Sequence, residues 1–229
     1  MLYKVLNEDG SCCHGGSGSW SLPTKLLDGS WEPGEWREVE GKLIACQNGL
    51  HGCDGETQLP EWLGPLICEM EYEGERIDAD NKIVVRRARL TRIVETWDAR
   101  TARLFACDCA ERVLALFERV YPNDARPREA IETARRFTNG QATMHELSAA
   151  YDSALAARAA SDDAGDASAA SEAALAASAV GDAASVALAA WAAGDAVWAA
   201  RAAASATAGA AERQWQGQRL RQYLEGAVA

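Results

Sequence analysis

The cysteine and histidine residues in the first third of the chain offer the most direct chemistry in this sequence. Cys46, His51 and Cys53 fall close together, and Cys12 and His14 lie upstream. Thiolate sulfur and imidazole nitrogen are the usual ligands of tetrahedral zinc, and these residues supply more ligands than one ion needs. However, the sequence contains no Cys-x-x-Cys pair. Two interpretations therefore stay open: a structural zinc site, or buried free cysteines with a hydrogen-bonded histidine.

The same residues also suggest a catalytic alternative, in which Cys46 or Cys53 is a nucleophile and His51 is its base. The sequence does not identify a third group that would orient the histidine. A phosphate-binding loop is not indicated, because the glycine-rich stretch 15–18 lacks the lysine and hydroxyl residue that must follow it. We therefore expect a protein without catalytic turnover, and keep the cysteine nucleophile as an alternative.

Short strands are expected to position these residues. The β-prone runs are Leu2–Leu6, Leu66–Tyr72 and the stretch 82–96, and a helical turn is expected at Leu59–Gly64. Glycine-containing turn signals separate the runs. Five tryptophans lie in or beside this region and are expected to fill its core, with a partly exposed pocket as the alternative: Trp20, Trp31, Trp36, Trp62 and Trp97. The pattern predicts a small β-rich or α+β domain with long loops.

A helix, a polar turn and a second helix are expected over residues 103–135. Asp108 and Glu111 fall on polar faces of the first helix, which Pro122 should end. Arg126 and Arg128 flank a proline at the opening of the second helix, where a proline loses no hydrogen bond. The two arginines are either solvated and paired with nearby carboxylates or part of a contact surface.

This segment, with its Cys-Asp-Cys-Ala-Glu-Arg start and its Asp-Ala-Arg-Pro-Arg-Glu-Ala-Ile-Glu-Thr-Ala-Arg continuation, resembles the bacterial "putative immunity protein" family over residues 104–211. The resemblance implies a helical protein that binds and neutralises a toxin without turnover. The phrase Asn-Gly-Leu-His at 48–51 is similar to an N-terminal module of phage and bacterial proteins whose activity is not established. This second likeness indicates a mobile-element context.

The region from Met144 onward is predicted to form successive helices, because alanine has the highest helix propensity. Gly-Asp-Ala triplets begin at Gly165, Gly181 and Gly194, and each is expected either to mark a helix boundary or to let backbones touch within a longer helix. Asp182 and Asp195 of these triplets are weaker candidates for an acidic partner-binding surface. Leu188, Trp191 and Trp198 share a helix face that should be core.

The composition limits the classes of partner. The formal net charge of -11 argues against binding of nucleic acid and suits a basic protein partner. No apolar run approaches the length of about 20 residues that spans a bilayer, and no signal peptide is expected. The odd number of cysteines, seven, favours reduced thiols and a cytoplasmic location.

We therefore expect an α+β protein, with a small β-rich domain at residues 1–97 and an alanine-rich α-helical bundle at 98–229. Its expected function is that of an antitoxin-like immunity protein, with a cognate toxin as partner and no required cofactor. Asp108, Glu111, Arg126 and Arg128 are the foremost candidates for contact with the toxin. The alternative is a phage or mobile-element protein that binds a small molecule or zinc through the N-terminal cysteine and histidine loops. Close-packing alanine faces suit a dimer as well as a monomer.

Overall fold

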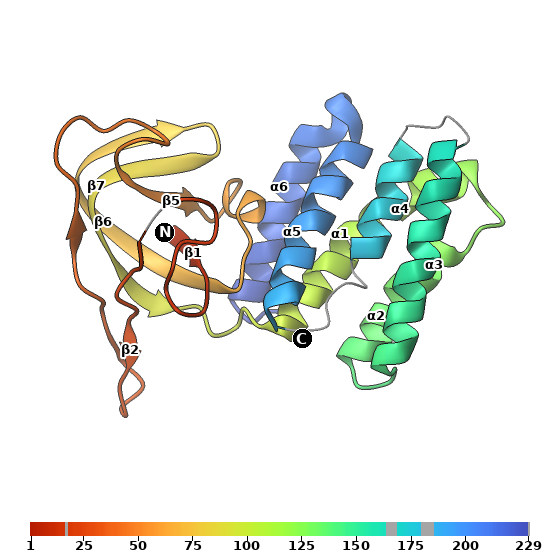
Figure 1. Ribbon diagram of the computed structural model, residues 1–229, viewed down its shortest axis with the longest axis horizontal. Helices are drawn as coiled ribbons and strands as arrows, with labels where there is room; N and C mark the ends of the chain where they lie inside the picture. The colour runs from red at the N-terminus through yellow and green to blue at the C-terminus, as the bar shows by residue number, and fades with distance from the viewer. Residues whose placement is uncertain (17, 164–168, 180–185, 229) are drawn as a thin grey trace. The chain divides into compact units, whose positions relative to one another are not determined.

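The computed structural model describes residues 1–16, 18–163, 169–179 and 186–228. The chain divides into two compact units, Met1–Trp97 and Asp98–Ala229. Figure 1 shows strands in the first unit and helices in the second. The expected α+β class is confirmed.

An antiparallel sheet that closes on itself forms the first unit. Its elements are β1 (Leu2–Leu6), β2 (Thr24–Lys25), β3 (Trp31–Glu32), β4 (Arg37–Glu38), β5 (Leu50–Asp54), the short helix η1 (Leu59–Glu61), β6 (Leu66–Ala79) and β7 (Lys82–Ile93). β1 pairs with both β5 and β6, and β7 pairs with the same two strands. These four strands therefore make a small barrel in which each has a partner on both sides. β4 adds a short pairing to β7, and β2 pairs with β3 as a separate hairpin.

The local predictions for this unit are confirmed. Strands form at the three expected places, and η1 forms within the expected turn. β6 runs further than the expected Leu66–Tyr72, to Ala79, because the added residues form an exposed arm paired with β7. Glu71 lies opposite Arg89, and Glu73 lies opposite Arg87, each pair forming a salt bridge on this hairpin. Such cross-strand pairs help to fix the register of the two strands.

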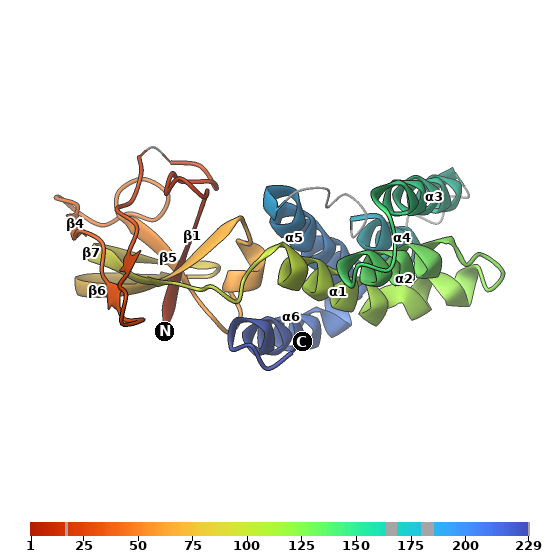
Figure 2. The same cartoon turned by 90° about the horizontal axis from the view of Figure 1, so that it is seen from below.

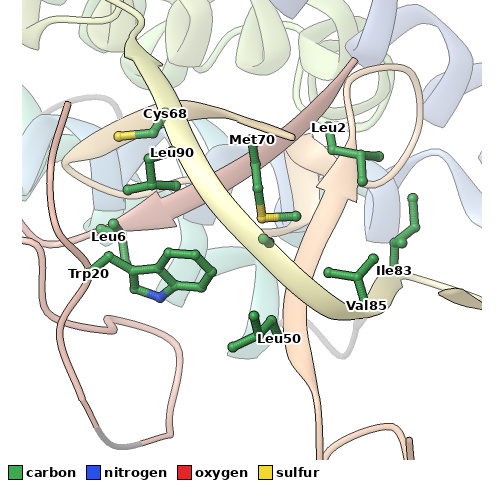
Figure 3. Close-up of a cluster of buried hydrophobic side chains, with 10 residues drawn as sticks. Leu2, Leu6, Trp20, Leu50, Cys68, Met70, Ile83, Val85 and Leu90 are labelled. Carbon is green, nitrogen blue, oxygen red and sulfur yellow. The ribbon is translucent and has the colours of Figure 1, made fainter. Parts of the chain in front are cut away.

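The barrel core is made of side chains from every strand that closes it. Figure 3 shows this cluster, whose members are Leu2, Leu6, Trp20, Leu50, Cys68, Met70, Ile83, Val85, Ala88 and Leu90. Trp20 reaches it from the loop after β1 and lies beside Leu6 and Leu90. Aliphatic and sulfur-containing side chains with one tryptophan fill this core, so it needs no phenylalanine.

Only two of the tryptophans expected in this core are buried. Trp20 is 5% exposed and Trp97 is 6% exposed. The interpretation is wrong for Trp31, Trp36 and Trp62, which are partly exposed. Cationic side chains cover these rings instead of apolar neighbours, and the guanidinium groups of two arginines lie 4.4 and 4.7 Å from the Trp36 ring centre.

Six helices form the described part of the second unit: α1 (Ala99–Val120), α2 (Arg126–Thr138), α3 (Met144–Asp163), α4 (Ala169–Ala179), α5 (Val186–Ala203) and α6 (Ser205–Leu224). Capping boxes open two of them. Asp98 and Thr101 cap α1, and Thr143 and Glu146 exchange hydrogen bonds at the start of α3. None of the described helices has the length and apolar character needed to cross a bilayer.

The bundle is organised around α1, which contacts α2, α4, α5 and α6 (Figure 2). Ala102, Ala106 and Ala110 follow one another at four-residue spacing and are at most 1% exposed. Residues four apart share a helix face, and these small side chains let neighbouring helices approach closely. Phe105 and Phe117 are fully buried on the same helix and supply the larger apolar area.

Two expectations for the alanine-rich region are corrected. Gly194 and Asp195 lie inside α5, so this triplet does not mark a helix boundary and falls within a longer helix, the second of the two alternatives. Trp198 is 54% exposed and is not core, because it projects from the outer face of α5. The triplets at Gly165 and Gly181, including Asp182, lie outside the described residues, as do the side chains of Leu188 and Trp191.

The close approach at Gly34 provides a test of the first unit. A Cβ atom at this position would collide with the backbone carbonyl oxygen of Ser21, which cannot move as a side chain tip can. We expect Gly34→Ala to lower the free energy of unfolding by about 2 kcal/mol, measured by denaturant titration. The control is Gly209→Ala in α6, which meets only the flexible end of Arg213. This variant should be as stable as the wild type or more so; equal destabilisation of both would contradict the fold described for residues 21–34.

Candidate functional site

A groove of about 500 Å³ runs between α1 and α6 in the second unit. Its walls are Asp108, Glu111 and Arg112 from α1 and Trp215, Gln218, Arg219 and Gln222 from α6. Both walls carry charged or amide groups, and Trp215 is the aromatic residue among them. The groove therefore offers a mixed polar surface with one large apolar side chain.

A buried carboxylate lies at the base of this groove. Asp108 is 8% exposed, and its Oδ1 accepts a hydrogen bond of 2.7 Å from Arg135. Its Oδ2 accepts from the Nε of Arg219 at 2.6 Å and from the hydroxyl of Tyr223 at 2.7 Å. Burial raises the pKa of Tyr223, and the hydrogen bond to Asp108 raises it further. Asp108 thus joins α1 to α2 and α6 by three charge-assisted hydrogen bonds.

Arg112 is fixed in the wall of the groove by two contacts. Its Nε donates to Glu212 at 2.7 Å, and the Glu212 side chain is only 4% exposed. Its guanidinium carbon lies 4.6 Å from the centre of the Trp215 ring. The stacking and the ion pair hold both side chains of the wall in place.

The structure places only some of the predicted partner-binding residues in the groove. Asp108 and Glu111 line the groove, and the Glu111 side chain is 57% exposed while it pairs with Arg135. The expected surface position of Asp108 is wrong, because donors from two other helices surround it. Arg126 and Arg128 do not line the groove; they pair with Asp124 and Glu118 at the turn between α1 and α2. Asp195 is an exposed residue of α5.

Sequence reasoning missed Arg112, Trp215 and Arg219 as groove residues. Arg219 meets Asp108 across 111 positions of the chain. No local pattern in α6 indicates that contact, because the apolar residues of its sequence are not gathered on one helix face.

A second hollow, of about 470 Å³, lies in the first unit. The predicted cysteine and histidine residues all line it: Cys12, His14, Cys46, His51 and Cys53. Their neighbours on the walls include Lys4, Trp20, Arg37, Trp62 and Lys82. We call this space the N-terminal cavity. The sequence therefore indicated the cavity by its cysteine and histidine residues and missed its cations.

The side chains of His14, His51 and Cys53 bond to the backbone. His14 Nε2 lies 2.7 Å from the carbonyl oxygen of Trp62, and the Cys53 thiol donates to the carbonyl of Tyr3. His51 Nε2 accepts the backbone N–H of Cys46 at 3.1 Å. Within the described part of the chain, no three His, Cys, Asp or Glu side chains gather closely enough to hold a metal ion. The zinc site stays a prediction, with no ligand set to support it here.

The thiols of the cavity differ in burial. Burial raises the pKa of Cys53, so its thiol stays protonated at neutral pH, and burial raises the pKa of Cys13 to about 11. Cys46 is exposed, and its Sγ lies 3.2 Å from Lys82 Nζ. The Nε2 lone pair of His51, which a general base would need, is occupied by the Cys46 amide. This geometry does not support a cysteine–histidine catalytic pair.

Lys4 is the cation that the strand pattern could have revealed. In β1 it shares a face with Leu2 and Leu6, both of which belong to the barrel core. Its Nζ donates to the carbonyl oxygen of His51 at 3.0 Å, and burial lowers its pKa. A lysine that alternates with core leucines is directed toward the interior rather than toward solvent.

The Asp108 network yields a stability prediction. Asp108→Asn leaves the partly buried guanidinium of Arg219 without its carboxylate and leaves Arg135 with only the exposed carboxylate of Glu111. Breaking a buried pair in this way costs about 3 kcal/mol. We expect this loss in the free energy of unfolding, followed by far-UV circular dichroism. The matched control is Glu111→Gln, which removes an exposed carboxylate from the same Arg135 and should cost less than about 1 kcal/mol. Similar losses for both variants would show that the buried network is not the main contribution.

The His51 environment yields a prediction about pH. Burial lowers the pKa of His51, and the charges of Lys4 and Lys82 lower it further. The unfolded chain therefore takes up the proton first, and the free energy of unfolding should fall as the pH drops below about 6.5. His51→Asn should lack this component of the pH dependence. Nitrogen NMR of the wild-type imidazole should show a neutral ring with its proton on Nδ1 near that pH; a charged ring would contradict the assignment.

Two protein families match the chain, one over its N-terminal part and one over its C-terminal part. Residues 92–223 match the family described as "Imm-5 like putative immunity protein". Residues 1–101 match a domain of unknown function (DUF7666). No curated protein and no solved structure is similar enough to the chain to give a match.

The first match covers more than half of the chain and includes every residue of the groove between α1 and α6. It confirms the resemblance drawn from the segment around Cys107 and Cys109. The chain therefore belongs to the Imm-5 like putative immunity protein family.

Proposed function

We propose that this protein is an immunity factor that neutralises a cognate protein toxin by binding it directly through the groove between α1 and α6. The observation that carries the proposal is that the groove lies wholly within the region matched by the immunity family. Family membership supports an immunity-type function and a protein partner. The groove is our assignment of where that partner binds.

The side chains of the groove suit contact with a protein. Tryptophan and arginine are the residues most enriched at energetic hot spots of interfaces. The guanidinium of Arg112 stacks on the Trp215 ring and donates a hydrogen bond to Glu212 in the unbound protein. Because these side chains are ordered before binding, little rotamer entropy is lost on association. Gln218 and Gln222 are exposed and supply amide donors and acceptors at the rim.

The overall charge supports a basic toxin as the partner. With a formal net charge of -11, the protein attracts a cationic surface over a distance of several ångströms. Such steering raises the association rate more than the final affinity. In this proposal the protein acts without turnover and meets its toxin in the cytoplasm.

A co-expression assay tests the proposal. The wild-type chain is expected to restore growth to cells that express its cognate toxin domain, and to bind that domain in calorimetry. We expect Trp215→Ala to weaken binding by about 30-fold, the effect of losing an interface hot spot. Trp198→Ala is the control, because Trp198 is an exposed tryptophan of the same bundle outside the groove.

A second variant separates binding from folding. Gln218→Arg places a long cation in the groove at an exposed position, so the helix should remain intact while the toxin is blocked. Circular dichroism confirms that each variant is folded. Full protection by both folded variants would overturn the groove as the binding site, and absence of protection by the wild-type chain would overturn the proposed function.

A further inference from the structure

The N-terminal cavity has a size and shape suited to a small organic molecule. Its volume of about 470 Å³ lies within the range of ligand pockets, about 300–1,000 Å³. Val5, Val39, Leu50 and the ring of Trp20 give it an apolar wall. Nothing in the matched domain of unknown function assigns a role to this space.

The charge of the walls is strongly one-sided. Lys4, Arg37 and Lys82 line the cavity, and no aspartate or glutamate is among its lining residues in the part of the chain that is described. This is the reverse of the whole chain, whose net charge is -11. A cavity with cations and no carboxylate attracts an anion.

Each of the three cations lies against an aromatic ring of the cavity wall. Lys4 Nζ lies 5.6 Å and the Arg37 guanidinium 5.0 Å from the centre of the same ring, that of Trp20. Lys82 Nζ lies 4.8 Å from the centre of the Trp62 ring. Lys4, Arg37 and Lys82 are all lining residues of the one cavity, and the charges of Lys4 and Lys82 both lower the pKa of His51 in its wall. The rings neutralise only part of this charge, because cation–π attraction is weaker than pairing with an anion.

Lys4 adds a reason to expect a ligand. It extends from the core face of β1, and its Nζ has the carbonyl oxygen of His51 as a partner. An inward lysine without a carboxylate partner on the walls destabilises the barrel relative to an apolar residue. A bound anion would offset that cost.

We propose that the N-terminal cavity binds a small organic phosphate monoester, with its phosphate among Lys4, Arg37 and Lys82 and its organic part against the apolar wall. A phosphate monoester carries a charge of about −1.5 to −2, which matches three cations better than the single charge of a carboxylate does. The space exceeds what inorganic phosphate alone would fill. This site is independent of the groove between α1 and α6, so the two proposals can fail separately.

Calorimetry with the full-length protein tests the site. The probes are AMP, phenyl phosphate and glucose 6-phosphate, each compared with its uncharged parent, adenosine, phenol or glucose. At least one ester is expected to bind with a stoichiometry of one, and its parent about tenfold more weakly or not at all. Benzoate is the carboxylate probe. Binding of benzoate in preference to the esters, or no binding of any ester at millimolar concentration, would overturn the proposal.

Variants assign the binding to the cavity. Lys4→Met and Lys82→Gln should each weaken binding of the ester by about tenfold or more, while Lys42→Gln, an exposed lysine that does not line the cavity, should leave it unchanged. Lys4→Met should also melt at the same temperature as the wild type or higher, because methionine suits the core face of β1. If Lys4→Met unfolds the protein, the stability cost assigned to Lys4 is wrong and Lys82→Gln decides the binding site. If the folded cavity variants bind the ester as well as Lys42→Gln does, the assignment to the cavity fails.

Discussion

The helical unit depends on the carboxylate of Asp108. Alanine-rich helices bury little apolar area per residue, so many arrangements of such helices differ little in energy. The buried carboxylate of Asp108 needs donors from both α2 and α6, so only a few helix arrangements satisfy it. Any arrangement that does not supply these donors leaves a buried charge without a partner. The same network supports the groove, since Arg219 is both a donor to Asp108 and a groove wall. Arg219 therefore contributes both to the packing of the helices and to the surface of the groove.

Local signals in the sequence predicted most of the elements and little of this network. β-prone runs located β1, β6 and β7, apolar residues at helical spacing located α1 and α2, and alanine content located the helices after them. Those signals act over a few residues. The partners of Asp108 lie 27, 111 and 115 positions away, and nothing in the spacing of polar residues on α1 distinguishes an aspartate that will be buried from a solvated one. Trp198 shows the converse error, because helical periodicity identifies a face but not the side of the bundle that it occupies.

The N-terminal cavity shows a different limit of sequence reasoning. The cysteine and histidine residues were predicted to form a site because they are chemically versatile, and they do line one cavity. Their polar atoms, however, satisfy backbone groups of the loops, which is the commonest use of buried polar atoms in proteins. The unusual residue is Lys4, a common surface type in an interior position. Residue type alone could not identify it, whereas its alternation with Leu2 and Leu6 could have.

The energetic costs in the first unit are concentrated around the cavity. Cys46 has a backbone φ of 65°, a left-handed conformation that costs a non-glycine residue about 1 kcal/mol or more. In that conformation the Cys46 amide bonds to His51 and its Sγ lies near Lys82. Lys4, in β1, loses hydration because it is buried. A barrel selected only for stability would have glycine or asparagine at position 46 and an apolar residue at position 4. These two costs meet at the N-terminal cavity, where the proposed phosphate monoester would offset the cost of the buried charge of Lys4.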